Sequence, residues 1–295
     1  MINEKVGLTP TFFHFFFQTA MTNDPKLARL ANILKQNAPL AVAFSGGIDS
    51  TFLLAMATEI LGADQVLALT ISSPLHPHWE LDESRKLASH FGVRQIVVDA
   101  EDILDIPEVR DNAPNRCYFC KKALFSRAIE VAHRLGFNHL ADGSNQDDLA
   151  DYRPGRQAVE ELRVLSPLLE AGLTKQEIRH YSKQKGLANW NKPANACLAT
   201  RFPTGAHLTV EGLDLVDRCE SVLRKAGFAG CRARIHGKLL RIEVPADDIA
   251  RFAVPEIRRQ IVIQCRELGL QYVTLDLAGY QSGSMNSPER SSGNS

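Results

Sequence analysis

The sequence predicts an α/β protein in which a doubly wound parallel sheet is followed by a smaller C-terminal α+β domain. Short, continuously apolar runs alternate with helical patterns in the first half of the chain, which indicates repeated βαβ units. From about residue 207 the order changes to helix, strand, strand, helix and strand. We therefore expect an N-terminal extension over 1–22, an α/β domain over 23–205, an α+β domain over 206–280 and a disordered tail over 281–295.

Each element follows from a local pattern. Asn23 or Asp24 can cap a first helix, whose apolar residues recur at helical spacing up to residue 37. Thr174 and Glu177 form a capping-box pattern at the start of a later helix. We expect further helices from about 207 and over 79–91, 122–135 and 249–268, and strands over 39–44, 65–71, 94–99, 137–141, 231–235, 239–244 and 272–277.

Opposite charges balance, because the chain has 34 Lys and Arg against 34 Asp and Glu. Proteins that bind polyanions usually carry a broad basic surface, so we expect no nucleic acid partner. No apolar run approaches the roughly 20 residues that span a bilayer, so we expect no membrane partner and a cytoplasmic location. The aromatic run at 12–17 is either a docking or oligomer element, or part of an upstream extension if translation begins at Met21.

The central feature is an apolar strand that ends in Ser45, Gly46 and Gly47 and leads into a helix. Glycines permit close approach of the backbone, and the N–H groups of a helix N-terminus attract anions, so this turn suits phosphate. It is not a Walker A loop, because no Gly-Lys-Ser/Thr follows. The pattern Ser-Gly-Gly-Xaa-Asp-Ser resembles the PP-loop of the ATP pyrophosphatase superfamily, with its adenine nucleotide α-hydrolase-like fold. The alternative is a glycine turn that only packs a βα unit.

The PP-loop resemblance implies a site for ATP and Mg²⁺. Asp49 is the expected Mg²⁺ partner, and residues 70–73, Thr70 and Ser72 among them, are expected to meet adenine and ribose through the main chain. The residues expected to hold the pyrophosphate are Ser45, Gly46, Gly47, Asp49 and Ser50.

An oxygen-rich loop follows the strand expected at 137–141. Residues 142–155 contain four aspartates interleaved with Gly and Asn, and they lie on the same edge of the sheet as the PP-loop. We expect Gly143 and Asn145 to contribute to the nucleotide site. Asp142, Asp147 and Asp148 are alternatives to Asp49 as Mg²⁺ ligands. A solvated turn with Asx caps is the other interpretation of this loop.

Three of the six cysteines suggest chemistry. Cys117 and Cys120 form Cys-Xaa-Xaa-Cys directly before an expected helix, beside Arg116 and Lys121, and cations and a helix N-terminus both lower thiol pKa. Cys197 lies in an irregular loop and is the expected third member of the set. The alternatives for the trio are a zinc site or simple buried cysteines. Structural roles are expected for Cys219, Cys231 and Cys265.

Several independent motifs resemble the LarE family, the ATP-dependent sulfur transferases that build the nickel-pincer nucleotide cofactor of lactate racemase. The resemblance covers about residues 25–285. Besides the PP-loop, its motifs in this chain are Arg116–Lys121, Asp142–Asn145 with Asp147 and Asp148, Asp151–Gly155, Ser166–Leu168 with Gly172–Lys175, Lys192 and Pro193 with Ala196–Ala199, and Arg232–Gly237.

The resemblance implies a substrate, a reaction and an assembly. In that family, ATP adenylates a carboxylate of pyridinium-3,5-dicarboxylate mononucleotide, and sulfur then displaces AMP to give a thiocarboxylate. Single-cysteine members sacrifice the sulfur of the cysteine that matches Cys197. This chain instead resembles the three-cysteine branch, in which Cys117, Cys120 and Cys197 would ligate a [4Fe–4S] cluster that carries the sulfide, from a donor not identified by the sequence. A homo-oligomer, by resemblance a hexamer, is expected.

Two arginines suggest how an anionic substrate binds. Arg232 and Arg234 alternate along an expected strand and so share one face. Two guanidinium groups on one face suit the 5′-phosphate or a carboxylate of the substrate, and the family resemblance supports that role. Glu220 is expected nearby on weaker grounds. The alternative is an exposed, charged strand face.

Other functions remain open on the sequence alone. Some tRNA thiolases also combine a PP-loop with Cys-Xaa-Xaa-Cys and a cluster, although the neutral charge balance counts against RNA. An ammonia-using synthetase of the NAD or GMP type shares the loop but has no use for three cysteines. A sensor or metallochaperone that binds adenine nucleotide without splitting it is the non-enzymatic alternative.

Overall fold

The computed structural model describes residues 24–149, 154–193 and 196–281. The expected extension, the aromatic run at 12–17 and all but the first residue of the expected tail lie outside these ranges. The described residues form two compact units: the first takes in 24–71, 79–99 and 121–193, and the second 72–78, 100–120 and 196–281. The domain boundary expected between residues 205 and 206 stays a prediction.

The first unit is built on a four-stranded parallel sheet. Its strands are β1 (Leu40–Ala43), β2 (Val66–Ser72), β3 (Arg94–Asp99) and β4 (His139–Ala141), in the order β3-β2-β1-β4. The central strand β1 pairs in parallel with β2 on one side and with β4 on the other. Its apolar residues are buried, as expected for a strand covered on both faces. The doubly wound fold class is confirmed.

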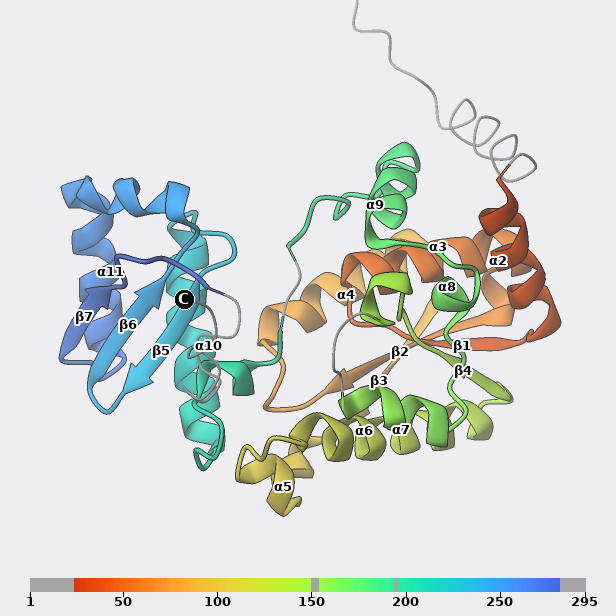
Figure 1. Ribbon diagram of the computed structural model, residues 1–295, viewed down its shortest axis with the longest axis horizontal. Coiled ribbons are helices and arrows are strands. Elements are labelled where there is room, and N and C mark those ends of the chain that lie inside the picture. The colour runs from red at the N-terminus through yellow and green to blue at the C-terminus, as the bar shows by residue number, and fades with distance from the viewer. Residues whose placement is uncertain (1–23, 150–153, 194–195, 282–295) are drawn as a thin grey trace, which may run out of the picture. The chain divides into compact units, whose positions relative to one another are not determined.

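Helices cover both faces of this sheet because right-handed crossovers run first one way and then the other. The helices α3 (Ile48–Leu61) and α4 (His78–His90) connect β1 to β2 and β2 to β3, and they lie on one face (Figure 1). The helix α6 (Arg116–Arg134) precedes β4 and lies on the opposite face with α7 (Pro154–Glu161). The remaining helices of this unit are α2 (Pro25–Gln36), α8 (Pro167–Glu170) and α9 (Lys175–Gln184).

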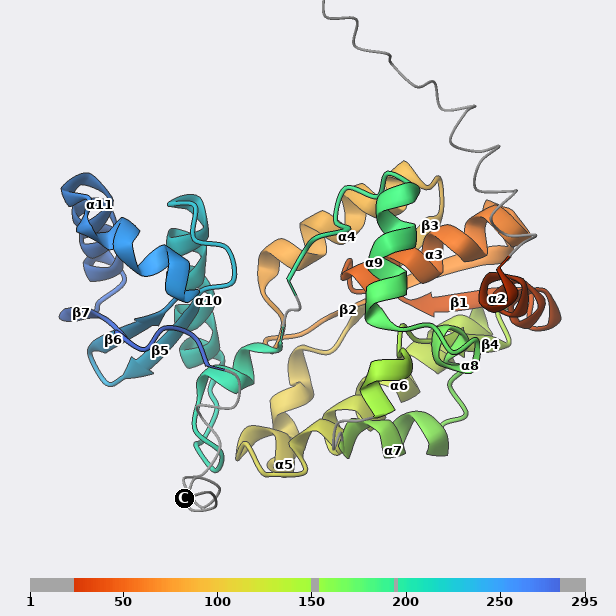
Figure 2. The same ribbon diagram turned by 45° about the horizontal axis from the view of Figure 1, so that its top comes forward.

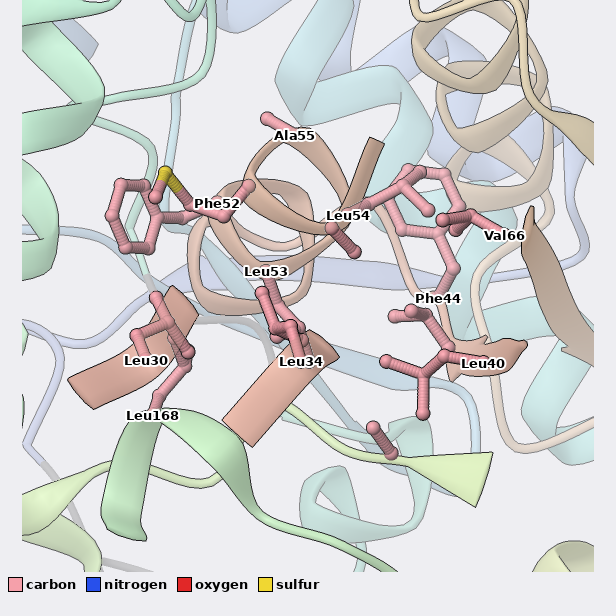
Figure 3. Packing of buried hydrophobic residues seen from close by; sticks show 14 of the residues in the cluster. Leu30, Leu34, Leu40, Phe44, Phe52, Leu53, Leu54, Ala55, Val66 and Leu168 are labelled. Carbon is pink, nitrogen blue, oxygen red and sulfur yellow. The ribbon is translucent and has the colours of Figure 1, made fainter. Parts of the chain in front are cut away.

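The core of the first unit forms around α3. Figure 3 shows Phe52 and Leu53 of this helix directed toward α2, where Leu30 and Leu34 are fully buried. The amphipathic α2 starts where the sequence predicts, because the Asp24 carboxylate accepts hydrogen bonds from the main-chain N–H groups of Lys26 and Leu27, at 2.8 and 3.3 Å. This packed core holds the N-terminus of α3 in place. We call the turn that leads into α3, residues 45–50, the phosphate-type loop.

The second unit contains a small three-stranded sheet with two long helices. Its elements are α10 (Val210–Lys225), β5 (Arg232–His236), β6 (Leu239–Glu243), α11 (Pro255–Glu267) and β7 (Tyr272–Leu275). The strand order is β5-β6-β7, antiparallel for the first pair and parallel for the second. Figure 2 shows α10 and α11 together beside this sheet. The predicted helix, strand, strand, helix, strand order matches these elements.

Several elements differ from the expectations. The helix expected over 249–268 is divided: a 3-10 helix, Ala246–Ala253, precedes α11, because Pro255 has no N–H to continue the first helix and suits the first turn of a new one. The helix expected from residue 122 begins at Arg116, so the Cys-Xaa-Xaa-Cys pair lies inside the first turns of α6 and not before it. A short α5 (Pro107–Arg110) was not predicted.

Within the described ranges, none of the helices combines the length and the apolar character needed to cross a membrane.

Candidate active site

The phosphate-type loop lies at the topological switch point of the first unit. Chain connections from β1 lead to β2 on one side, whereas β4 joins on the other side, and ligands of open α/β sheets bind beyond the carboxyl ends of strands at such a point. Gly47 caps α3, and among the described residues no side chain accepts a hydrogen bond from the N–H groups of its first turn. Gly46 has a φ of +70°, which a residue with a side chain rarely adopts. The loop can therefore present main-chain N–H groups to an anion.

Hydrogen bonds inside the loop preserve its shape. The Ser50 hydroxyl donates to the Gly47 carbonyl at 3.1 Å and lies 3.3 Å from the Ser45 hydroxyl, which accepts from the Gly47 N–H at 3.3 Å. Gly143, in the loop after β4, packs directly on this turn: a Cβ atom there would lie 2.9 Å from the Ser50 nitrogen. The loops after β1 and β4 thus meet, as the parallel sheet predicts.

Asp49 is the carboxylate of this loop with a free oxygen. Its Oδ1 atom is buried and has no hydrogen-bond partner within the part of the chain that the structure describes, whereas Oδ2 lies 3.4 Å from Nζ of Lys175. Burial raises the pKa of Asp49, and the nearby charge of Lys175 opposes that rise. A buried carboxylate oxygen without a donor fits a ligand for Mg²⁺.

The other aspartates of the site are occupied. The Asp142 carboxylate accepts hydrogen bonds from the Ser144 N–H and hydroxyl, at 3.1 and 2.7 Å, and from the Ser166 hydroxyl at 2.8 Å, and Lys121 lies 3.3 Å away. Asp147 accepts from the Lys175 N–H at 2.9 Å. Asp148 accepts from the Asn145 N–H at 3.0 Å. These bonds leave Asp49 as the stronger Mg²⁺ candidate of the four.

The remaining nucleotide residues expected from the sequence have mainly structural contacts. The Thr70 hydroxyl is buried, donates to the Phe44 carbonyl at 2.7 Å and accepts from Gln95 at 2.7 Å. The Ser72 carbonyl accepts from the Ala100 N–H at 2.9 Å. Asn145 is buried, and its amide oxygen accepts from the Asp147 N–H at 3.1 Å. Their expected part in nucleotide binding stays a prediction.

Asn189 and Lys192 contact the phosphate-type loop, a position that was not expected for either residue. The Asn189 amide donates to the Gly46 carbonyl at 3.1 Å and to the Thr51 hydroxyl at 2.9 Å. The Lys192 ammonium lies 3.4 Å from the same carbonyl, pairs with Glu83 and stacks over the Trp79 ring at 4.6 Å. Both lie about 140 residues along the chain from Gly46, so no local pattern could have placed them at this loop, although Lys192 belongs to one of the motifs found in the sequence.

Arg116 joins two of the three predicted cysteines in the second unit. One of its guanidinium nitrogens, Nη2, lies 3.7 Å from Sγ of Cys117 and 3.9 Å from Sγ of Cys197. Cys120 follows Cys117 by three residues on α6, so the two project from the same side of the helix. Burial opposes the charge of Arg116, but the neighbouring Cys197 and Cys117 outweigh it and hold its pKa above the usual value.

The six cysteines, all within the described ranges, form no disulfide, and they fall into two groups. Cys117 is exposed and Cys120 and Cys197 are partly exposed, whereas the other three are buried. Within the described ranges no group of three or more His, Cys, Asp or Glu side chains is arranged to hold a metal ion. The donor chemistry of three accessible thiols, two of them beside one cation, nevertheless fits an iron–sulfur cluster.

Buried ion pairs fix the chain around Cys197. Arg201, in the 3-10 helix that Cys197 caps, donates to the Cys197 carbonyl at 3.1 Å and to Glu220 through two nitrogens, at 2.8 and 2.9 Å. Glu220 also accepts from the Ala233 N–H at 3.0 Å. These bonds give Glu220 a structural function that the sequence did not reveal.

The two arginines of β5 are buried, so they do not form an exposed, charged strand face. Arg234 makes a two-pronged ion pair with Glu243, at 2.9 and 3.1 Å. Arg232 donates to the Gly230 and Cys231 carbonyls, at 3.3 and 2.8 Å, and stacks on Tyr280 at 4.8 Å. Burial and the charge of Arg201 lower the pKa of Arg232, and the charge of Glu220 opposes that shift. Within the described part of the chain, Arg232 forms no direct ion pair with a carboxylate. A buried guanidinium without a counter-ion suits an anionic ligand.

Known proteins are similar in sequence to this chain over nearly its whole length. The chain is 38% identical over 261 residues to a pyridinium-3,5-bisthiocarboxylic acid mononucleotide synthase from Lactiplantibacillus plantarum, covering 88% of this chain and 94% of that protein. The chain belongs to the LarE family. Membership in the LarE family makes the chain an ATP-dependent sulfurtransferase, as its motifs predict.

Other relatives place the LarE family among PP-loop proteins. An uncharacterized protein from Synechocystis is 39% identical, over 89% of this chain and 97% of its own length. An argininosuccinate synthase from Haloarcula marismortui is 29% identical over 61% of this chain and 44% of its own length. The sequence model of the asparagine synthase family matches residues 29–145, which include the PP-loop and the start of the loop after β4.

Proposed function

We propose that this chain uses ATP to adenylate a carboxylate of pyridinium-3,5-dicarboxylate mononucleotide and then converts it to a thiocarboxylate, in synthesis of the nickel-pincer nucleotide cofactor. The observation that carries the proposal is the near full-length similarity to a synthase of the bisthiocarboxylic acid mononucleotide. The accessible thiols around Arg116 support a sulfur transfer, since an ammonia-using PP-loop enzyme has no need of them.

Adenylation follows from the loop geometry. A carboxylate oxygen of the substrate attacks the α-phosphorus of ATP, and pyrophosphate leaves with the bonding electron pair. The uncapped N–H groups of α3 would stabilise the negative charge of the leaving pyrophosphate, and Asp49 would hold Mg²⁺ against it. The step is necessary because AMP is a much better leaving group than carboxylate oxygen.

Sulfur would then displace AMP at the activated carbonyl. A [4Fe–4S] cluster on Cys117, Cys120 and Cys197 would supply a bound sulfide for this purpose, and it is our preferred sulfur source. The second route uses the Cys197 thiolate, which attacks the carbonyl and expels AMP to give a thioester. Loss of the Cα proton of Cys197 with cleavage of its Cβ–S bond would release the thiocarboxylate and leave dehydroalanine, so such a protein would turn over once.

Arg232 is the residue that we expect to bind an anionic group of the substrate, because the hydrogen bonds that its buried guanidinium donates go to carbonyl oxygens and not to a carboxylate. Arg234 is a weaker candidate, since it already forms an ion pair with Glu243, although Glu243 also pairs with Arg241. The arginines of one subunit could serve the active site of another, which accords with the expected homo-oligomer. Light scattering after gel filtration measures the number of subunits directly.

The decisive experiment is anaerobic purification of the wild type beside Cys117→Ala and Cys219→Ala, with measurement of iron, labile sulfide and pyrophosphate release. About four irons per chain in the wild type and in Cys219→Ala, but not in Cys117→Ala, would support the cluster route. Protein that never takes up iron, yet loses the mass of H₂S at Cys197 after turnover, as conversion of cysteine to dehydroalanine requires, would establish the sacrificial route. Absence of pyrophosphate release with the pyridinium substrate would refute the proposed function.

A further inference from the structure

The guanidinium of Arg116 contacts two sulfurs that are distant in the sequence. Cys197 lies 81 residues beyond Arg116, and its Sγ atom is 3.9 Å from the same nitrogen that lies 3.7 Å from Sγ of Cys117. Cysteine sulfur can accept a weak hydrogen bond, so one guanidinium nitrogen within reach of two sulfurs can hold them near each other. Arg201 also interacts electrostatically with Cys197 and donates to its carbonyl at 3.1 Å. Arg116 is the residue whose guanidinium contacts the sulfurs of both Cys117 and Cys197.

Asn112 orients this guanidinium. Its side-chain oxygen accepts a hydrogen bond from the other nitrogen, Nη1, of Arg116. Its amide nitrogen donates to the Phe202 and Pro203 carbonyls, at 3.4 and 2.7 Å, just beyond the 3-10 helix that follows Cys197. One buried side chain therefore connects the start of α6 to the segment after Cys197.

The backbone at Asn112 is adapted to this position. Asn112 is only 1% exposed and has a φ of +48°, in the left-handed region that asparagine and glycine tolerate best. Its carbonyl accepts from the Gly205 N–H at 3.0 Å, and the neighbouring Arg110 carbonyl accepts from the Leu208 N–H at 2.7 Å. The strained residue is therefore supported on several sides, as is typical of a functional constraint.

We propose that Arg116, aimed by Asn112, is a positioning residue that holds the sulfurs of Cys117 and Cys197 side by side in the metal-free protein. The fork-shaped guanidinium bonds the asparagine with one nitrogen and both sulfurs with the other, which a lysine ammonium cannot reproduce in one fixed plane. The contact of Arg116 with both sulfurs, which we call the bridge, follows from the geometry alone. Its role in preparing the three cysteines to bind the cluster rests on the proposed function.

Proximity of the two sulfurs is measurable without activity. Dibromobimane becomes fluorescent when both of its arms alkylate thiols that are close together, and peptide mass spectrometry after digestion identifies which cysteines it joins. We expect metal-free, reduced wild type to give Cys117–Cys197 bridges, and Arg116→Gln to lower the ratio of bridged to singly labelled Cys197 about tenfold, as loss of hydrogen bonds to a charged group predicts.

Two further variants separate positioning from folding. Arg110→Gln is the matched control, since Arg110 is an arginine six residues away whose recorded side-chain contacts are with Asp111; it should leave the ratio unchanged. Asn112→Gly removes the amide but tolerates the left-handed backbone, and it should lower the ratio like Arg116→Gln. If Arg116→Gln fails to fold, judged by circular dichroism, Asn112→Gly and Arg116→Lys provide the same test.

The outcomes distinguish this inference from the proposed function. A bridging ratio in Arg116→Gln that equals or exceeds the wild-type ratio would overturn the inference, because Arg116 would then be a spacer or irrelevant. Iron uptake by the wild type is measured in parallel. A lowered ratio in Arg116→Gln, with no iron uptake by the wild type, would support the bridge and refute the cluster. An unchanged ratio in Arg116→Gln, with normal iron uptake by the wild type, would refute the bridge and support the cluster.

Discussion

Replacing Glu220 by glutamine tests whether the buried ion pair with Arg201 stabilises the second unit. Both side chains are 3% exposed, and the carboxylate accepts three hydrogen bonds of 2.8 to 3.0 Å. Removing one partner of a buried pair costs about 3–5 kcal/mol, because the other charge is left uncompensated. The amide oxygen of glutamine can still accept one bond, so we expect a loss of about 3 kcal/mol in the free energy of unfolding.

The assay is urea unfolding followed by circular dichroism, with Asp214→Asn as the matched control. Asp214 lies on the same helix, but its pair with Arg218 is exposed and spans 3.7 Å, so its loss should cost no more than about 0.5 kcal/mol. We also expect Glu220→Gln to loosen the main chain at Cys197, since Arg201 binds its carbonyl. A loss below about 1 kcal/mol for Glu220→Gln would refute the assignment of a structural role to this pair.

Three further predictions concern the nucleotide site and the partners. Burial raises the pKa of Asp49 above its value in the unfolded chain, so the stability that this carboxyl contributes is present below the unfolded pKa of 3.8 and is lost as the pH rises through the folded pKa. Asp49→Asn should therefore raise the thermal midpoint at pH 7 but not at pH 3, while lowering pyrophosphate release about 100-fold; an unchanged rate would remove Asp49 from the mechanism. Gly143→Ala should destabilise the protein by about 1–3 kcal/mol and weaken ATP binding in calorimetry, because the new Cβ would lie 2.9 Å from the Ser50 nitrogen, and normal binding would contradict this packing. Labelled tRNA should show no tight, salt-sensitive binding in anisotropy titrations, and its observation would favour a tRNA thiolase.

The parts of the fold that local patterns control were predictable from the sequence. The apolar run of β1, the glycine turn and α3 lie where the pattern indicates, and Asp24 and Thr174 cap their helices as expected. The start of α6 was wrong by one and a half turns, because the Asn115 carbonyl accepts the Tyr118 N–H and the helix begins inside the expected loop.

Contacts between distant segments account for what the sequence could not show. Alternation along β5 correctly places Arg232 and Arg234 on one face. The pairing of β5 with β6 puts Glu243 opposite Arg232, yet its carboxylate reaches diagonally to Arg234. Likewise, the sequence shows that Arg116 is next to Cys117 on the chain, whereas its contact with Cys197 depends on how the segment after residue 196 folds. Side-chain partners of this kind follow from register and loop packing, which periodicity does not encode.

The burial of Cys219, Cys231 and Cys265 has a practical consequence for kinetic work. Burial raises the pKa of the Cys231 thiol to about 12, and all three side chains are at most 3% exposed, so alkylation must wait until the second unit opens. The other three thiols can react in the folded protein. One alkylation time course, resolved by mass, therefore contains a fast phase from the accessible thiols near Arg116 and a slow phase from the buried thiols. The slow phase measures the rate of unfolding in the same sample.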